Sequence, residues 1–148
     1  MRETSGAERV AGYREAVEAA GLPFDPLLAP QGDWTVEAGY RMMSDVLALP
    51  DPPTAAVVAS HTMVVGALQA LRAGGLTVPR DMALVSFDDT ATWPVVDPPI
   101  TALEGRDDDV GALAAKLLLD RLSAPGLAGG YEIRLPMRLI VRRSCGCL

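Results

Sequence analysis

Cysteine and histidine are scarce in this sequence, and their scarcity limits the chemistry that the chain can carry. There are two cysteines, Cys145 and Cys147, and both stand among the last four residues. No disulfide can therefore staple the interior, and reduced thiols are expected. A metal site at this Cys-x-Cys pair gains little support from the single, distant His61. We therefore expect neither a bound metal ion nor a cofactor.

Long apolar runs are also missing, and no segment is long enough to cross a bilayer as a helix. The residues Met1-Arg2-Glu3-Thr4-Ser5-Gly6 lead straight into a charged, helix-like segment. They lack the apolar region of a secretory signal. The sequence therefore predicts a cytoplasmic protein that has no contact with membranes.

An excess of basic charge is absent as well, because the net charge is −6 and the pI is about 4.7. This is the wrong sign for a surface that neutralises the phosphates of a duplex, so this chain itself should not bind nucleic acid. Arg134, Arg138, Arg142 and Arg143 gather near the end of the chain but alternate with apolar residues. We interpret all four as the solvated face of a half-exposed strand.

What is present is apolar content of 49% in 148 residues, enough for one ordinary core and a single domain. Three segments carry apolar residues at helical spacing. Thr35 is placed to cap the second of them. The expected apolar faces are Val10, Tyr13, Val17 and Ala20 in residues 7–20; Val36, Tyr40, Met43 and Leu47 after Thr35; and Val64, Leu68 and Leu71 before Gly74.

Continuous apolar runs at 54–59 and 82–87 are typical of buried parallel strands, and 26–29 is expected to be a third, shorter strand. Strands alternating with helices predict an α/β fold, a three-layer Rossmann-like parallel sheet wrapped by helices on both faces. Ligands of such sheets bind at the carboxyl ends of the strands. Functional side chains should therefore gather in the segments that begin at Gln31, Ser60 and Asp88.

The last third of the chain changes character. A proline-rich crossover at 93–99 precedes an amphipathic helix at 110–122, and 131–135 and 138–142 read as two strand segments split by Pro136. Each large aliphatic side chain of that helix is worth roughly 1.5–3 kcal/mol when buried. We therefore expect the helix to pack against another copy of the chain or to fold back onto its own sheet.

Motifs spread over the whole chain resemble the effector domain of the lactose and galactose repressor family. The resemblance is carried, in order, by Arg9-Val10-Ala11-Gly12-Tyr13, by the Pro-Thr-Ala strand at 53–59, by the Met63–Leu68 helix, by the stretch from Gly75 to Asp89, by Pro98-Pro99-Ile100-Thr101, and by the closing segment 139–144.

This resemblance implies a periplasmic-binding-protein-like domain of two lobes with a ligand in the cleft between them. Residues 1–98 and 128–148 would then form most of the C-terminal effector-binding lobe, and 99–127 would form the crossover and a helix that belongs to the N-terminal lobe. The rest of that lobe, and a helix-turn-helix headpiece that reads operator DNA, are absent from this sequence. The resemblance also implies a homodimer, with the helix that begins near Thr62 in its interface.

The family comparison further implies an effector site for a sugar or related small metabolite. Arg9 matches an arginine that reaches ligand hydroxyls, and a guanidinium suits a vicinal diol because it offers parallel donors. The alternative is an ordinary surface arginine. Trp34 resembles an aromatic that covers the apolar face of a sugar ring, with packing at the rim of the core as its alternative.

Asp88 is expected to contact the ligand, with Phe87 and Asp89 supporting it, although both carboxylates could instead only cap the turn. Ser60 and His61 stand where the family usually has Asn-Asp, so a shorter hydroxyl and a titratable ring replace an amide and a carboxylate. Both are candidate ligand contacts. His61 could also lie at a subunit interface or serve the fold alone.

Two other functions compete with a non-enzymatic repressor domain. A solute-binding protein of a sugar transporter shares the fold, but the N-terminus and the Arg142-Arg143-Ser144 segment count against it. An aspartyl-phosphate enzyme could use Asp88-Asp89-Thr90 at a strand end. It would need a magnesium-binding carboxylate cluster and a lysine partner, whereas the only lysine is Lys116.

Overall fold

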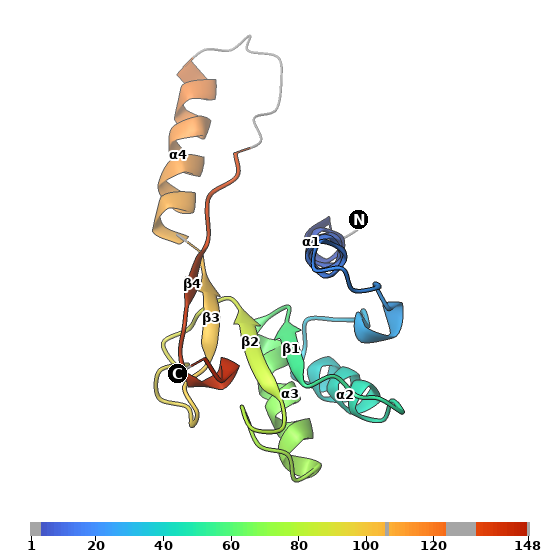
Figure 1. Ribbon diagram of the computed structural model, residues 1–148. Helices are drawn as coiled ribbons and strands as arrows, with labels where there is room; N and C mark the ends of the chain where they lie inside the picture. The colour runs from blue at the N-terminus through green and yellow to red at the C-terminus, as the bar shows by residue number, and fades with distance from the viewer. Residues whose placement is uncertain (1–3, 106, 124–132, 148) are drawn as a thin grey trace.

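The computed structural model describes residues 4–105, 107–123 and 133–147 of the chain (Figure 1). Its elements follow one another as α1 (Thr4–Ala19), the 3₁₀ turn η1 (Pro26–Leu28), α2 (Val36–Leu47), β1 (Ala55–Val58), α3 (His61–Ala73), β2 (Ala83–Phe87), β3 (Thr101–Glu104), α4 (Asp107–Ser123), β4 (Arg138–Ile140) and the 3₁₀ turn η2 (Arg143–Cys145).

A four-stranded sheet in the order β1-β2-β3-β4 forms the centre of the structure (Figure 1). β1, β2 and β3 are parallel, with Val57 opposite Val85 and Val85 opposite Thr101, and β4 closes the sheet antiparallel to β3. The predicted α/β class with a mainly parallel sheet is confirmed. β3 begins directly after the proline-rich crossover, at a position where no strand is predicted from the sequence.

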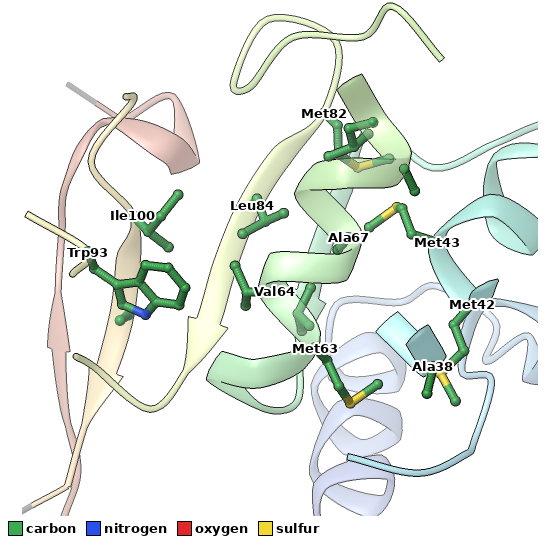
Figure 2. Close-up of a cluster of buried hydrophobic side chains, with 14 residues drawn as sticks. Ala38, Met42, Met43, Met63, Val64, Ala67, Met82, Leu84, Trp93 and Ile100 are labelled. Carbon is green, nitrogen blue, oxygen red and sulfur yellow. The ribbon is translucent and has the colours of Figure 1, made fainter. Parts of the chain in front are cut away.

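The core lies on the side of the sheet that faces α2 and α3. Leu84 of β2 is fully buried, and in Figure 2 its side chain lies between Ile100 and α3. Val64 contributes from α3, and Trp93, which enters from the loop after β2, completes the same cluster (Figure 2). Apolar residues of α3 thus meet alternate residues of the strands on one face, and those of α2 pack against α3.

Two glycines bring α2 and α3 into backbone contact. A methyl group built on Gly66 would collide with the carbonyl oxygen of Val36 and the backbone nitrogen of Tyr40, and one built on Gly39 would collide with the backbone of Met63. Without side chains at these positions, the two helices approach more closely than side chains ordinarily allow.

The predicted N-cap of α2 is also confirmed, because the Thr35 hydroxyl accepts a hydrogen bond from the Ala38 backbone at 3.1 Å.

The expected apolar face of α2 is partly wrong. Tyr40 is exposed, whereas Ala38, Gly39, Met42 and Met43 are buried. The contact with α3 through the glycines rotates the helix so that its small residues face inward. In α1, by contrast, the expected Val10, Tyr13 and Val17 are the half-buried positions, while Ala20 lies beyond the helix and is exposed.

The opposite face of the sheet is only partly covered, which corrects the expectation that β1 is buried on both faces. Val57 is 65% exposed although its neighbour Val58 is buried. β1 is an edge strand, and α1 approaches this side of the sheet at Phe87, near the carboxyl end of β2. On this face of the sheet, α1 therefore lies near the carboxyl ends of the strands and leaves the middle of β1 exposed.

The segment 26–29 was expected to be a strand and is instead the turn η1. The Asp25 carboxylate accepts a hydrogen bond from the Leu27 backbone at 2.9 Å, and Pro26 occupies the first position of the turn. A capping aspartate followed by proline favours a helical turn over an extended strand. The apolar pair Leu27-Leu28 was a misleading signal, because a run this short has no periodicity of its own.

The helix expected at 110–122 is present as α4, and it stands away from the sheet (Figure 1). It does not fold back, so that alternative is wrong for the chain as a single copy. Leu113 and Leu117 are half-buried, and the exposed apolar residues of α4 are Val110, Leu118, Leu119 and Leu122. Among the described residues, no helix is both long and apolar enough to span a membrane.

Of the two strand segments expected at the end of the chain, the second contains β4, and the described part of the first, 133–135, has no strand. Residues 133–137 are irregular, and 131 and 132 lie outside the described residues. After β4 the chain forms η2, where the buried Ser144 hydroxyl donates to the Leu84 carbonyl at 2.6 Å and accepts from the Thr101 backbone at 2.8 Å. These bonds fix the final segment against β2 and β3.

Candidate functional site

The carboxyl ends of β1 and β2 place four polar residues at one edge of the sheet. Ser60 and His61 follow β1 and begin α3, and Asp88 and Asp89 follow β2. Because parallel strands end at the same edge, residues far apart in the sequence meet there. This is the edge at which the sequence analysis expected functional side chains.

Arg9 of α1 reaches this edge and is held there by three groups. Its Nη1 donates a hydrogen bond to the Ala59 carbonyl, at the end of β1. Its guanidinium carbon lies 3.9 Å from the centre of the Phe87 ring and 4.9 Å from the centre of the Trp34 ring. Stacking on two aromatic rings fixes the plane of the guanidinium. Arg9, Trp34 and Phe87 are therefore brought together although no strand precedes Trp34.

His61 and Asp88 face one another at the same edge. The His61 Nδ1 and the Asp88 Oδ2 are 3.7 Å apart, and the two side chains are 53% and 43% exposed. Asp88 has a φ of 79°, in the left-handed region that aspartate tolerates better than most residues. The turn at the end of β2 thus presents the Asp88 carboxylate to solvent beside the imidazole.

Ser60 has a local role that the sequence did not reveal. Its hydroxyl accepts a hydrogen bond from the Thr62 backbone at 3.3 Å, which makes it the N-cap of α3, and the residue is 7% exposed. A capping hydroxyl satisfies one of the open donors of the first turn. Ser60 therefore fixes where α3 begins, and with it the position of His61.

Asp89 points away from this exposed pair and binds Arg142. Arg142 Nη1 donates to Oδ1 at 2.8 Å and Nη2 donates to Oδ2 at 2.7 Å, while Nη1 also donates to the Ile100 carbonyl at 2.6 Å. The two side chains are 16% and 15% exposed. The hydrogen bond from Arg142 lowers the pKa of Asp89, and the same bond raises the pKa of Arg142. The pair is therefore charged at neutral pH.

This geometry corrects the interpretation of the four C-terminal arginines. Arg134, Arg138 and Arg143 are exposed, as expected, but Arg142 is largely buried and paired. Alternation along a strand indicates which residues share a face, but it does not indicate that Arg142 meets a carboxylate 53 positions earlier in the chain.

Trp93 is a second supporting residue that the sequence analysis missed. Its indole Nε1 donates to the Ser86 hydroxyl and to the Asp88 carbonyl, each at 3.2 Å, and the Ser86 hydroxyl donates to the same carbonyl at 2.8 Å. Two donors therefore hold the backbone at Asp88.

Across the described ranges 4–105, 107–123 and 133–147, no three His, Cys, Asp or Glu side chains cluster as they would around a metal ion.

The arrangement can hold a small polar ligand. Arg9 supplies a planar cation with several N–H donors, Trp34 supplies a flat apolar surface, and Asp88 supplies acceptors. His61 can donate or accept according to its tautomer. Donors, acceptors and an aromatic face at one rim are the elements of a site for a polyhydroxylated molecule.

Comparison with known proteins identifies the family of this chain. A family model described as the periplasmic binding protein-like domain matches residues 2–145. The HTH-type transcriptional repressor CytR of Escherichia coli (strain K12) is 35% identical over 140 residues, which cover 95% of this chain and 41% of the relative. The HTH-type transcriptional repressor MelR of Bacillus subtilis (strain 168) is 37% identical over 147 residues, covering 99% of this chain and 41% of the relative.

Among solved structures, the transcriptional regulator CelR-cellobiose complex superimposes with a TM-score of 0.85 at 37% identity, covering 93% of this chain and 42% of that one. The transcription regulator CcpA of Lactococcus lactis superimposes with a TM-score of 0.83 at 28% identity, covering 97% of this chain and 52% of that one. The chain thus spans about two fifths of the length of the curated relatives that it matches.

Proposed function

Because the chain belongs to the periplasmic binding protein-like domain family, we propose that it is the effector-binding part of a transcriptional repressor of the lactose and galactose repressor type. Its effector is a sugar or a related small metabolite. The domain makes and breaks no covalent bond. Its relatives are transcription regulators, which supports this proposal over a transporter component or an enzyme.

The observation that carries the proposal is the Arg9 guanidinium, stacked on Trp34 and Phe87 at the carboxyl edge of the sheet. Its bond to Ala59 uses one of five N–H donors. The remaining donors can serve vicinal hydroxyls of a sugar, and the Trp34 ring can cover an apolar face of the same molecule.

Asp88 and His61 form the polar side of the proposed site. The Asp88 carboxylate accepts hydrogen bonds from ligand hydroxyls, and His61 lies within 3.7 Å of it to share them. Asp89 holds the loop through Arg142, Phe87 supports Arg9, and Ser60 positions His61. In this scheme Ser60 acts through the first turn of α3 more than through direct contact.

The same proposal divides the chain between two lobes. Residues 1–98 and 128–148 form most of one lobe, and 99–127 supply the crossover and α4 to the other. The exposed Leu118 and Leu122 of α4 are then covered by the remainder of that second lobe. β3 lies within 99–127 but pairs with β2 and β4, so the chain leaves the sheet of the first lobe only after Glu104.

Regulation follows from closing the cleft. The effector biases an equilibrium between two arrangements of the lobes, with a coupling free energy on the order of 1–3 kcal/mol. A homodimer formed through α3 transmits this to paired headpieces on operator DNA, in the cytoplasm. The headpieces belong to the part of the relatives' length that this chain does not span.

The aspartyl-phosphate alternative conflicts with the geometry of Asp89. Both of its carboxylate oxygens accept hydrogen bonds from Arg142, so it is engaged in the ion pair. Asp88, the other candidate nucleophile, faces His61 rather than a lysine.

The test is a thermal-shift screen of the complete gene product with sugars, nucleosides and sugar phosphates, cellobiose among them. A ligand at one hundred times its dissociation constant stabilises the native state by about 2.7 kcal/mol. The Arg9→Ala variant should lose the shift. Arg14→Ala is the matched control, because Arg14 also lies on α1 but stacks on Phe24, 4.3 Å from its ring centre. Equal shifts in wild type and Arg9→Ala would contradict the proposed site.

A further inference from the structure

The two cysteines lie together in a turn that the proposed effector site does not use. Cys145 ends η2, and Gly146 follows with a φ of 72°, in the left-handed region that glycine adopts without strain. This turn places the Cys147 thiol so that it donates to the Cys145 carbonyl across 3.7 Å. Cys145 is half-buried and Cys147 is exposed.

The closeness of the two thiols distinguishes them chemically. Hydrogen bonding by Cys147 is the largest cause that lowers the pKa of the Cys145 thiol, and the same interaction raises the pKa of the Cys147 thiol. A thiolate is a far better nucleophile than a thiol, and a second thiol beside it can resolve an oxidised sulfur. The turn thus provides an attacking and a resolving sulfur two residues apart.

We propose that Cys145 and Cys147 are a redox-active pair that a hydroperoxide closes into an intramolecular disulfide. The Cys145 thiolate attacks one oxygen of the hydroperoxide, the O–O bond breaks, and the other oxygen leaves as an alkoxide or hydroxide that takes up a proton. Cys145 is then a sulfenic acid. The Cys147 sulfur displaces its hydroxyl, which forms the S–S bond and releases water.

Overall the two thiols lose two electrons and two protons, and the hydroperoxide is reduced to an alcohol and water. The residues around the two thiols favour a disulfide over a bound metal ion. In the part of the chain that the structure describes, no third histidine, cysteine or carboxylate joins the two thiols. Zinc in proteins ordinarily has at least three protein ligands, whereas a disulfide needs only the two sulfurs.

Arg142 connects the Cys145–Cys147 pair to the loop that carries Asp88. The Cys145 thiol donates to the Arg142 carbonyl at 3.4 Å, and the Arg142 side chain binds Asp89. Asp89 Oδ1 in turn accepts from the Thr90 backbone at 3.0 Å. A disulfide sulfur has no hydrogen to donate. Formation of the disulfide therefore removes the hydrogen bond from Cys145 to the Arg142 carbonyl and weakens the connection to the loop.

The first experiment measures whether the disulfide forms. The complete protein is reduced, freed of reductant, treated with one equivalent of hydrogen peroxide, alkylated and digested with trypsin. Cleavage after Arg143 releases both cysteines in one peptide. We expect that peptide without alkyl groups and lighter than its reduced form by two hydrogens. The Cys147→Ser variant, which keeps Cys145, should instead yield a sulfenic acid that a dimedone probe traps.

Two results would overturn the proposal. One is a wild-type peptide that is alkylated on both thiols to the same extent with and without peroxide, and the other is a disulfide that forms only between chains. Hydrogen exchange at the Thr90 amide tests the link to the loop. Oxidation should speed it at least several-fold in wild type and leave it unchanged in Cys145→Ser, whose hydroxyl can neither form the disulfide nor be oxidised by peroxide. An unchanged rate in oxidised wild type would exclude the link.

Discussion

The Arg142 guanidinium and the Asp89 carboxylate form two parallel hydrogen bonds, of 2.8 and 2.7 Å, between the last segment of the chain and the loop after β2. A third bond, from Arg142 to the Ile100 carbonyl, joins the crossover before β3 to the same guanidinium. Three segments that are distant in the sequence are thus held by one side chain. The loop that presents Asp88 depends on this side chain for its position.

Replacing Arg142 by alanine should therefore destabilise the protein strongly. Loss of one partner leaves the other charge largely buried, which typically costs roughly 3–5 kcal/mol. With the pair still about 15% exposed, we expect the lower end of that range, about 3 kcal/mol, measured by urea unfolding.

The matched control is Arg138→Ala. Arg138 also pairs with a carboxylate, Glu104, at 2.6 Å, but the arginine side chain is mostly exposed. Exposed pairs contribute about 0–1 kcal/mol. If both variants lost the same stability, burial of the Arg142–Asp89 pair would not be the cause.

The pH dependence of stability should carry a contribution from Asp89. The hydrogen bond from Arg142 lowers its pKa in the folded state. Its stabilising contribution is then fully present above the pKa of an unfolded aspartate, about 3.9, and is lost as the pH falls through the folded value. Unfolding free energies measured from pH 7 downward should fall more steeply below about pH 4 for wild type than for Asp89→Asn.

The two curves should therefore converge in acid, since protonation removes from the wild type the same charge that Asp89→Asn lacks at every pH. Curves that stay parallel down to about pH 2 would show that Asp89 gains nothing from its charge in the folded state.

The contact between α2 and α3 predicts a sharp difference between two glycine substitutions. A Cβ at Gly66 would meet the backbone of Val36 and Tyr40, neither of which can rotate away. Overpacking typically costs about 1–3 kcal/mol, and we expect Gly66→Ala at the upper end, measured as a loss of unfolding free energy. Gly12→Ala, in the open middle of α1, meets nothing within 4 Å and should stabilise by about 0.5–1 kcal/mol.

A Gly66→Ala protein as stable as wild type would mean that α2 and α3 can separate without loss. Crystal or solution structures of that variant would then show a wider spacing of the two helices.

These residues also show how far the sequence could lead. Periodicity and capping placed α3, Thr35 and the strand at 83–87 correctly, because those signals are local. Ordered motifs identified the family, which the comparisons confirm. The strand order predicted that Trp34, Ser60 and Asp88 share one rim, and the resemblance implied that Arg9 reaches the same ligand. The structure brings Arg9 and Trp34 into contact and places Asp88 at the same edge, and ligand contact by all three stays a prediction.

What the sequence could not provide were contacts that depend on the packing of distant segments. Gly66 looks like any helical glycine until α2 lies across it. Arg142 has the sequence pattern of an exposed strand residue, and only the fold brings it against Asp89, 53 positions away. At 26–28 the two leucines suggested a strand, but Asp25 and Pro26, which are also local signals, favour the turn that the structure has.

Trp93 provides the last prediction, because it links the core to the loop of Asp88. Its indole donates to the Ser86 hydroxyl and the Asp88 carbonyl, and both Trp93 and Ser86 are buried. Trp93→Phe keeps a ring in the core but removes the donor. Leaving buried acceptors without it costs about 1–3 kcal/mol, which urea unfolding would measure.

A double-mutant cycle with Ser86→Ala separates this effect from a simple loss of volume. If the indole bond is responsible, Trp93→Phe should cost less in the Ser86→Ala background, with a coupling free energy of at least about 0.5 kcal/mol. Strictly additive losses would assign the effect to packing of the smaller ring. Since the Ser86 hydroxyl also donates to the Asp88 carbonyl, the double variant removes both donors from that oxygen. Among the four proteins of the cycle, it should therefore show the fastest hydrogen exchange in the loop that follows β2.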